Sequence, residues 1–265
     1  MGWLIDRHVQ YPAKLGFPVI AEDSGVELGC VALALLALLE LHRAAANAGY
    51  LDLAHRFAGY ILSQADAAGE FHHRLLLPSL KPAGHQARYA TAQSILALAE
   101  LASDTGEKRY LDAALKSESA LAARDFGVRE HGHWVLYAID ALAAVAPNAD
   151  HRAHAGRIAR AIVVYPLYRN DGLSNPLSCY SEALAAYLSL LRRPAPRDGH
   201  VDSPGEGPGE TAARRTLEEN LSLLTEYRLA DGGFVEGEGR PEVQIDHIQH
   251  AMSAYLAHAL LFGNP

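Results

Sequence analysis

A short apolar phrase recurs five times along the chain, at residues 34–38, 94–98, 138–142, 183–187 and 251–255. Every copy opens on Ala or Ser and has Ala at its fourth position. The second, third and fourth copies follow one another at a step of about 44 residues, and the outer steps are longer. A repeat of this length is typical of proteins built from one structural unit used several times.

Each copy lies in a long segment rich in Ala and Leu, which predicts a helix from propensity and period. A more polar helical segment follows each of the first four copies, and the residues between the second copy and its partner, 104–106, read as a short helix–helix turn. Only two short extended pieces are indicated, near Phe71 and Phe234. The pattern therefore predicts an all-α protein of repeated helical hairpins. The polar partner helices are expected at 50–66, 107–124, 150–164 and 210–228.

Loop lengths favour a closed ring of hairpins over an open solenoid. Long loops precede the apolar helices on one side of every unit, at 67–88, 126–132, 165–177 and 230–243, whereas most opposite turns are short. Variable loops gathered on one side of a scaffold are typical of a functional face. We expect one domain over residues 1–265, an (α/α)5–6 toroid, either complete or short of a hairpin, with apolar inner and amphipathic outer helices. Its one flexible segment is expected at 193–209, which is rich in Pro and Gly.

The repeat register also selects one helix face. Positions −5, −1 and +2 relative to the first residue of each phrase fall within an arc of roughly 60°. In four copies these positions carry polar side chains within otherwise apolar helices, which predicts the lining of a shared cavity suited to proton transfer. Taken singly, each could instead be a buried polar residue with a local structural partner. The polar members are Tyr89, Gln93, His133, Tyr137, Asp140, Ser178, Glu182, Asp246, His250 and Ser253.

The loops at the same helix ends add candidate ligand-binding residues. Helix N-termini that converge at one mouth favour a carboxylate or phosphate on the ligand. Arg74, Arg88 and Trp134 could hold such a ligand by ion pairing and stacking. For ordinary surface loops, the same charges would simply be solvated. With Gln93 and His247 from the helices, the predicted substrate-binding set is Asp23, His72, Arg74, Arg88, Gln93, His131, Trp134, Phe234 and His247.

Composition narrows the possible partners. The chain has 31 acidic and 23 basic residues and a formal net charge of −8, and no Lys/Arg cluster stands out, so nucleic acid and acidic membrane surfaces are poor partners. The two cysteines, Cys30 and Cys179, fit a reducing compartment. The apolar run at 31–41 is too short to span a bilayer. We expect a cytoplasmic protein that acts on a small molecule.

Metal and cofactor binding find little support in the motifs. The chain has fourteen histidines, and the pairs His131/His133 and His247/His250 have tolerable ligand spacing. Cys30, Cys179 and His247 also share position −4 of their repeats, but cysteine is commonly a small buried hydrophobic residue. Cys-x-x-Cys and His-Glu-x-x-His patterns are absent, as are a glycine-rich phosphate loop, a dinucleotide fingerprint and a Gly-x-Ser-x-Gly elbow. The expectation is therefore no metal and no cofactor.

Residues 89–93, 98–114 and 133–138 resemble the helical-hairpin repeat of the (α/α) toroid enzymes, and the Gly-Glu-Phe turn at 69–71 and the Asp-Gly-Gly-Phe turn at 231–234 are similar to turns in that group. The group includes six-hairpin glycosidase-like proteins and the toroid of glucuronyl C5-epimerases, and terpene-cyclase toroids resemble it more distantly. The resemblance implies a cavity at the N-terminal ends of the inner helices and a saccharide or uronate substrate.

The resemblance leaves the reaction open. Glycoside hydrolysis would use two carboxylates across the scissile bond, from Asp23, Asp140, Glu182 and Asp246. Lyase or epimerase chemistry would use a base and an acid from Tyr89, His133, Tyr137 and His250. An acid/base enzyme of one of these kinds is the leading hypothesis. The alternatives are a natural-product cyclase on the same toroid and a noncatalytic helical-repeat module that binds a peptide or protein.

Overall fold

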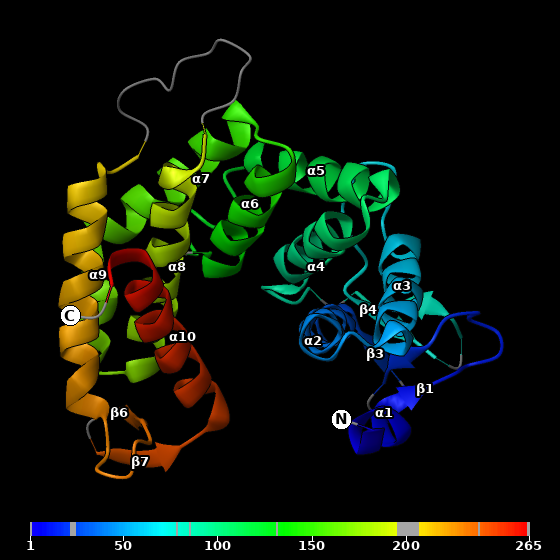
Figure 1. Ribbon diagram of the computed structural model, residues 1–265, viewed down its shortest axis with the longest axis horizontal. Helices are drawn as coiled ribbons and strands as arrows, with labels where there is room; N and C mark the ends of the chain where they lie inside the picture. The colour runs from blue at the N-terminus through cyan, green and yellow to red at the C-terminus, as the bar shows by residue number, and fades with distance from the viewer. Residues whose placement is uncertain are drawn as a thin grey trace. The chain divides into compact units, whose positions relative to one another are not determined.

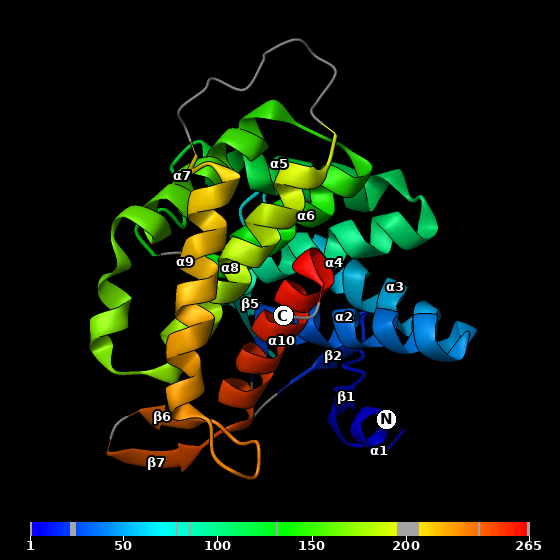
Figure 2. The same cartoon turned by 60° about the vertical axis from the view of Figure 1, so that its left-hand side comes forward.

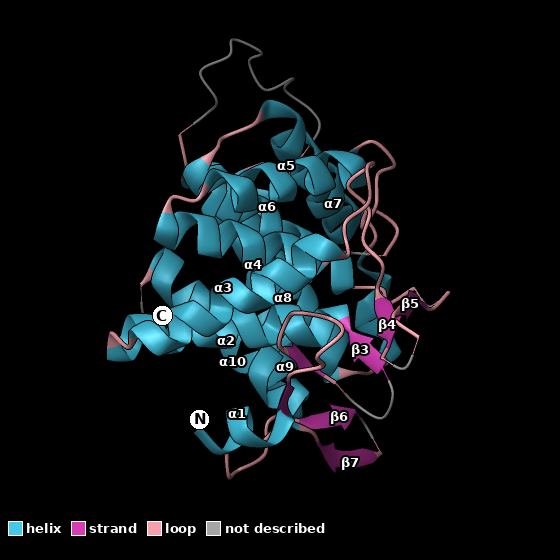
Figure 3. Cartoon of the chain, turned by 90° about the vertical axis from the view of Figure 1, so that its right-hand side faces the viewer, coloured by secondary structure: helices cyan, strands magenta, loops and turns pink. Residues whose placement is uncertain are grey.

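The computed structural model describes residues 2–21, 25–77, 79–84, 86–130, 132–194, 207–237 and 239–263. About 66% of the described residues are helical, and the strands among them are short (Figures 1 and 3). The all-α prediction is confirmed. The chain forms two compact units, Met1–Arg124 with Ala144–Ala146, and Asp125–Ala143 with Pro147–Pro265. Most of the predicted flexible segment lies outside the described residues.

Unit 1 contains two helical hairpins. Helix α2 packs against α3 and α4, and α4 packs against α5. The Asn47 side chain caps α3 by accepting a hydrogen bond from the Gly49 amide, and Gly106 ends α4 in the left-handed conformation that favours glycine. The elements are α1 (Gly2–His8), β1 (Val9–Gln10), β2 (Val19–Ile20), β3 (Gly25–Glu27), α2 (Leu28–Ala45), α3 (Ala48–Ser63), β4 (Arg74–Leu76), β5 (Lys81–Pro82), α4 (Ala90–Thr105) and α5 (Lys108–Ala122).

Helix α2 is longer than the apolar run that predicted it. Its 18 residues are sufficient in length and hydropathy to cross a membrane, a property that the core helices of globular units share. In unit 1, α2 buries Leu28, Val31, Leu35 and Leu39 in contact with neighbouring helices. Its apolar character thus supplies core contacts.

Unit 2 is built around α8. This helix packs against α9 and α10, and the three lie side by side in Figures 1 and 2. Helix α7 also contacts α8 and α9. The elements are α6 (His133–Val145), α7 (Ala149–Val164), η1 (Pro166–Asp171), α8 (Ser174–Arg192), α9 (Glu210–Leu224), η2 (Thr225–Tyr227), β6 (Val235–Gly237), β7 (Arg240–Val243) and α10 (Ile245–Phe262).

A small hairpin fixes the start of α8. Strands β6 and β7 pair in antiparallel fashion, and the chain continues from β7 into α10. The Ser174 hydroxyl donates a 2.6 Å hydrogen bond to the Val235 carbonyl, and Leu173 forms an isolated bridge with Gly237. A side chain on Gly237 would collide with the Gly172 carbonyl, so the close approach requires glycine. The hairpin therefore ties the beginning of α8 to the segment that leads into α10.

The five apolar phrases lie in α2, α4, α6, α8 and α10, as the repeat predicted. The four polar partners are α3, α5, α7 and α9, each within a few residues of its expected bounds, with η2 completing the last one. The extended pieces near Phe71 and Phe234 are present as bridges beside β4 and β6. Helix α1, the 3-10 helix η1 and strands β1 to β3 had not been predicted.

Candidate active site

Unit 2 brings four chemically active side chains together. His133 comes from the start of α6, Cys179 and Glu182 from α8, and His250 from α10. One ligand-type atom from each residue lies within 4.8 Å of those from the others. Cys179 and Glu182 are three residues apart and therefore share a face of α8. We call these four residues the His–Cys–Glu cluster.

A short hydrogen bond joins Glu182 to His250. The carboxylate Oε2 and the imidazole Nδ1 are 2.6 Å apart, and the side chains are 1% and 13% exposed. An ionised carboxylate can only accept, so Nδ1 is the donor and Nε2 carries the lone pair of the neutral ring. A carboxylate that holds one nitrogen of a histidine sets its tautomer and stabilises its protonated form. The pair is therefore suited to move a proton at Nε2.

Tyr137 extends this pair by one hydrogen bond. Its hydroxyl donates to the Glu182 carboxylate. Burial, followed by the negative charge of Glu182, raises the pKa of the Tyr137 hydroxyl well above its ordinary value. Tyr137 therefore stays protonated at neutral pH. It holds the carboxylate from one side while His250 holds it from another.

Aromatic contacts order the side chains around His133. The His133 and His250 rings meet edge to face, with centroids 5.5 Å apart. Trp134 packs beside His133 at 5.5 Å and beside Tyr137 at 5.8 Å. Contacts of this kind restrict ring rotation as well as burying apolar area. They place two imidazoles next to each other within one cluster.

Two glycines shape the loop that leads into α6. The Gly132 amide donates to the Gly127 carbonyl at 2.8 Å, and the Glu130 carboxylate accepts from the Gly127 amide at 3.0 Å. Gly127 has a φ of +93°, and a Cβ on Gly132 would come within 3.0 Å of the Gly127 Cα. This tight loop fixes where α6 begins and so where His133 points.

The repeat register explains three of these positions. Tyr137, Glu182 and His250 each occupy position −1 of their phrases, and the structure brings them into contact. The equivalent residue of α4, Gln93, is buried in unit 1 against Gly29 of α2. A Cβ on Gly29 would lie 2.6 Å from the Gln93 Oε1, so the amide occupies the space that glycine leaves.

Asp140 and Asp246 lie outside the cluster, which corrects the predicted arc within unit 2. Asp140 forms a bidentate ion pair with Arg193, with contacts of 2.6 and 3.1 Å. Asp246 is 49% exposed in the first turn of α10, and its carboxylate is 4.0 Å from the His247 Nε2. The predicted arc was defined only by the angle around each helix. His133 and Asp140 share that angle but are seven residues apart, which separates them by roughly 10 Å along the helix axis.

Because Asp140 pairs with Arg193, we expect Asp140→Asn to act on stability. Losing a partly buried bidentate pair should lower the free energy of unfolding by roughly 1 kcal/mol. Urea denaturation monitored by circular dichroism measures this effect. Asp112→Asn, which removes an exposed pair with Lys108, is the control and should change stability by less. An Asp140→Asn protein of unchanged stability would show that the ion pair adds nothing.

The remaining predicted helix and loop residues have separate surroundings. In unit 1, Arg88 stacks on the Tyr89 ring at 5.4 Å, Arg74 pairs with Glu27 at 3.2 Å, and His72 is exposed. In unit 2, His247 is buried beside Asp246. A lining shared by the residues of both units stays a prediction. Asp23 and His131 lie outside the described residues.

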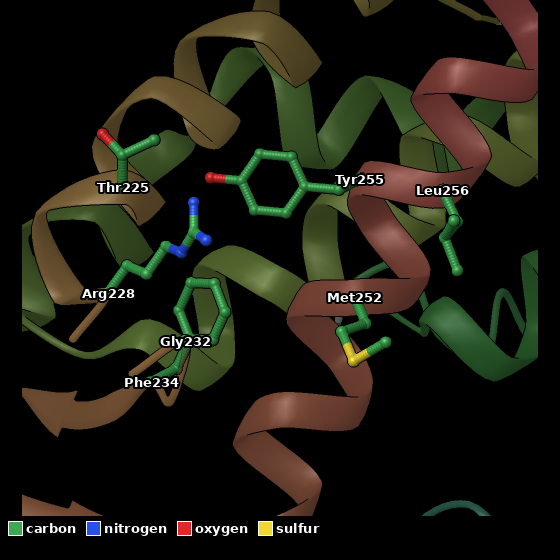
Figure 4. Close-up of a pocket in the computed structure, with 7 residues that line it drawn as sticks. All are labelled: Thr225, Arg228, Gly232, Phe234, Met252, Tyr255 and Leu256. Carbon is green, nitrogen blue, oxygen red and sulfur yellow. The ribbon is translucent and has the colours of Figure 1, made fainter. Parts of the chain in front are cut away.

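Phe234 lines a different pocket of unit 2 (Figure 4). This cavity of about 440 Å³ lies between η2, the turn before β6 and α10. The Phe234 and Tyr255 rings are 6.4 Å apart, and the Tyr255 hydroxyl donates to the Leu221 carbonyl. Its lining shares no residue with the His–Cys–Glu cluster. Phe234 thus belongs to a mainly apolar pocket that Arg228 also lines.

Sequence reasoning did not select Cys179 for the site. A cysteine in an apolar helix is commonly a small buried hydrophobic residue, so its type alone gives no signal. Its spacing gives a signal, because Cys179 lies one helical turn before Glu182, and residues three apart share a face.

His73 of unit 1 was not predicted either. Its ring bonds to the Thr91 hydroxyl at 2.8 Å and to the Ala87 amide at 2.9 Å, which ties its loop to α4.

The fold is similar to that of solved (α/α) toroid proteins, which confirms the predicted all-α toroid class. No protein-family model matches the sequence, and no curated protein matches it either. A cellobiose 2-epimerase from Spirochaeta thermophila is similar in structure, with a TM-score of 0.62 and 16% identity over 91% of this chain and 71% of that one. A D-mannose isomerase has a TM-score of 0.67 and 12% identity over 98% and 78% of the two chains.

A GH76 α-mannanase from Bacteroides thetaiotaomicron is also similar, with a TM-score of 0.64 and 11% identity over 98% of this chain and 78% of that one. At such identities the similarity describes the fold alone. The named activities, an epimerase, an isomerase and a glycoside hydrolase, are those of the other proteins.

Proposed function

We propose that this protein is a sugar-processing enzyme that moves a proton at a carbon next to a carbonyl group, as an epimerase or an isomerase. The observation that carries the proposal is the buried Glu182–His250 hydrogen bond, with a second imidazole, His133, beside it. Two of the structural neighbours are named as sugar epimerase and isomerase, which supports a substrate of this class.

The cluster favours proton transfer over glycoside hydrolysis. Hydrolysis with two carboxylates needs a pair that flanks the scissile bond, roughly 5 to 9.5 Å apart. The His–Cys–Glu cluster holds one carboxylate, that of Glu182. Asp140 is engaged by Arg193, and Asp246 is exposed at the helix start. Two imidazoles, one of them bonded to a carboxylate, can accept and donate protons at neutral pH. A single carboxylate is not enough for glycoside hydrolysis by the two-carboxylate mechanism.

The proposed reaction uses the two imidazoles in sequence. The His250 Nε2 removes the proton from the carbon next to the carbonyl, and the C–H electron pair moves toward the carbonyl oxygen to give an enediolate. Glu182 stabilises the resulting imidazolium. Protonated His133 then returns a proton to carbon. Return to the opposite face of the same carbon re-forms the carbonyl group and gives the epimer. Return to the former carbonyl carbon gives the isomer, with the proton of the neighbouring hydroxyl passing to the former carbonyl oxygen as the new carbonyl forms. His250 then loses its proton to water and His133 takes one up, which restores the starting state.

Proton exchange with solvent tests this function whichever of the two products forms. The full chain is incubated in D₂O with D-mannose, D-glucose, D-fructose and cellobiose, and loss of the proton signal next to the carbonyl is followed by NMR. We expect exchange with at least one sugar and a decrease of about 10² to 10⁴-fold in His250→Gln. His258→Gln, two turns further along α10, is the matched control and should exchange normally.

Two results would contradict the proposal. One is a folded wild-type protein that exchanges no proton of any of these sugars. The other is His250→Gln exchanging at the wild-type rate, which would remove His250 from the reaction. Helical circular dichroism of each sample establishes that the chain is folded.

A further inference from the structure

We propose that the His–Cys–Glu cluster also binds a divalent transition-metal ion of the zinc type. The inference goes beyond the proposed function and rests on the donor set itself. Two imidazoles, a thiol and a carboxylate offer nitrogen, sulfur and oxygen donors, the ligand types that Zn²⁺ takes in proteins. Mixed nitrogen and sulfur ligation disfavours Mg²⁺ and Ca²⁺, which prefer oxygen.

The distances suit a tetrahedral centre after small side-chain rotations. Bonds of about 2.0 to 2.3 Å in a tetrahedron separate neighbouring donor atoms by roughly 3.3 to 3.8 Å. All four donors of the cluster already lie within 4.8 Å of one another. The Glu182 and His250 atoms, 2.6 Å apart in their hydrogen bond, would separate by about an ångström to admit the ion. Three helices, α6, α8 and α10, hold the donors at this spacing.

Charge balance also favours a divalent ion at this place. With Cys179 deprotonated, the cluster would carry two negative charges, from the thiolate and from the Glu182 carboxylate. A buried charge without compensation is costly, and Zn²⁺ would neutralise both. Binding would release the proton of the thiol, and the hydrogen that His250 holds at Nδ1 would move to Nε2, so affinity should increase with pH.

Neighbouring side chains could orient the ligands. The Tyr137 hydroxyl donates to the Glu182 carboxylate, which fixes that ligand from outside the cluster. Asn175, one turn before Cys179, accepts a hydrogen bond from the thiol at 3.3 Å. A rotated Asn175 amide would present its NH₂ group to a thiolate. Hydrogen bonds that orient a ligand residue in this way are common at metal sites.

Metal binding and the proton-transfer reaction would exclude each other, because an ion on the His250 Nδ1 puts the hydrogen of the neutral ring on Nε2, the nitrogen that acts as the base. An ion on His250 and Glu182 leaves no base at that imidazole, so we expect Zn²⁺ to inhibit deuterium exchange and a chelator to restore it. The binding experiment has its own readout, so that the metal site and the proposed function can fail separately.

Cobalt is the probe, because tetrahedral Co²⁺ with a thiolate ligand absorbs visibly and in the near ultraviolet. Chelator-treated, reduced full-length protein is titrated with Co²⁺. We expect one ion per chain, a thiolate-to-cobalt charge-transfer band, and displacement of that band by Zn²⁺. Cys179→Ser should abolish the band, whereas Cys30→Ser, a change at the exposed cysteine of α2, should keep it. Glu182→Gln should weaken binding at least tenfold.

Thermal unfolding provides a second measurement of metal binding, one that also reveals whether a variant is folded. Zn²⁺ at saturating concentration should increase the thermal unfolding midpoint of the wild type, because a ligand that binds only the folded state stabilises it. The same increase should be absent in His250→Gln. Binding of less than one Co²⁺ per chain, or a charge-transfer band that persists in Cys179→Ser, overturns the metal site. Sugar proton exchange by a protein that fails this test would leave the proposed function standing.

Discussion

Glu182→Gln is expected to lower kcat/KM for sugar proton exchange by about 10² to 10⁴-fold. The carboxylate accepts from the His250 Nδ1 at 2.6 Å in a place that is almost fully buried. A glutamine amide has no negative charge to stabilise the imidazolium, and its NH₂ group can place the ring in the other tautomer, with the hydrogen on Nε2. The decrease should fall on kcat, since Glu182 acts through His250. Steady-state kinetics by NMR separates kcat from KM.

A matched substitution distinguishes loss of this charge from a general effect on the fold. Glu219→Gln removes an exposed carboxylate that pairs with Arg169 on the surface of unit 2, and it should retain full activity. Glu182→Asp keeps the charge but shortens its reach, so its activity should lie between those of the wild type and Glu182→Gln. If Glu182→Gln turns over sugar as fast as the wild type, the carboxylate does not assist His250.

The second large effect is a loss of stability in mild acid, caused by His151. This side chain is 3% exposed in α7, and burial, helped by nearby His154, lowers its pKa from 6.5 to about 4. Between pH 6.5 and 4, His151 is therefore protonated in the unfolded chain and neutral in the folded chain. Stability should fall by up to about 1.4 kcal/mol per pH unit in this window, or about 3 kcal/mol in total, and the contribution vanishes above pH 7.

Urea denaturation at several pH values between 7.5 and 4 measures this loss. His151→Gln removes the titrating group, so its stability should depend less steeply on pH than that of the wild type. His72→Gln, a change at an exposed histidine of unit 1, is the control and should follow the wild type. Equal pH dependence in His151→Gln and the wild type would show that His151 titrates alike in the folded and unfolded chains.

The repeat made most of the helical architecture predictable. Small residues at fixed places in each phrase mark helices long enough to carry a period, and α2, α4, α6, α8 and α10 are found where the phrases lie. Strands β1 to β3 span two or three residues each, too few for an alternating pattern to be recognised. The cytoplasmic location and the absence of nucleic-acid and membrane partners stay predictions.

The residues of the site that share one position of the repeat could be predicted from the sequence, whereas the exposure of Asp246 and the place of Cys179 in the cluster could not. Tyr137, Glu182 and His250 share position −1, so the alignment placed them together before any contact was known. Asp246 lies in the first turn of α10 with its side chain 49% exposed, whereas the next residue, His247, is buried. Cys179 shares its face with Glu182, but ligands that come from three helices leave no local motif to read.

The position of His250 on the last helix makes the site sensitive to a small part of the fold. The other three members of the cluster come from α6 and α8, whereas α10 joins unit 2 chiefly through α8 and follows the β6–β7 hairpin. The buried residues of α10 are His247, Ala251 and Ala254, and an element with few buried contacts opens locally at a lower free energy than the whole unit. Undocking of α10 alone would separate His250 from Glu182 with α8 and α9 still folded. Activity would then disappear on warming before most of the helical signal does, so inactivation would report on one helix rather than on global unfolding.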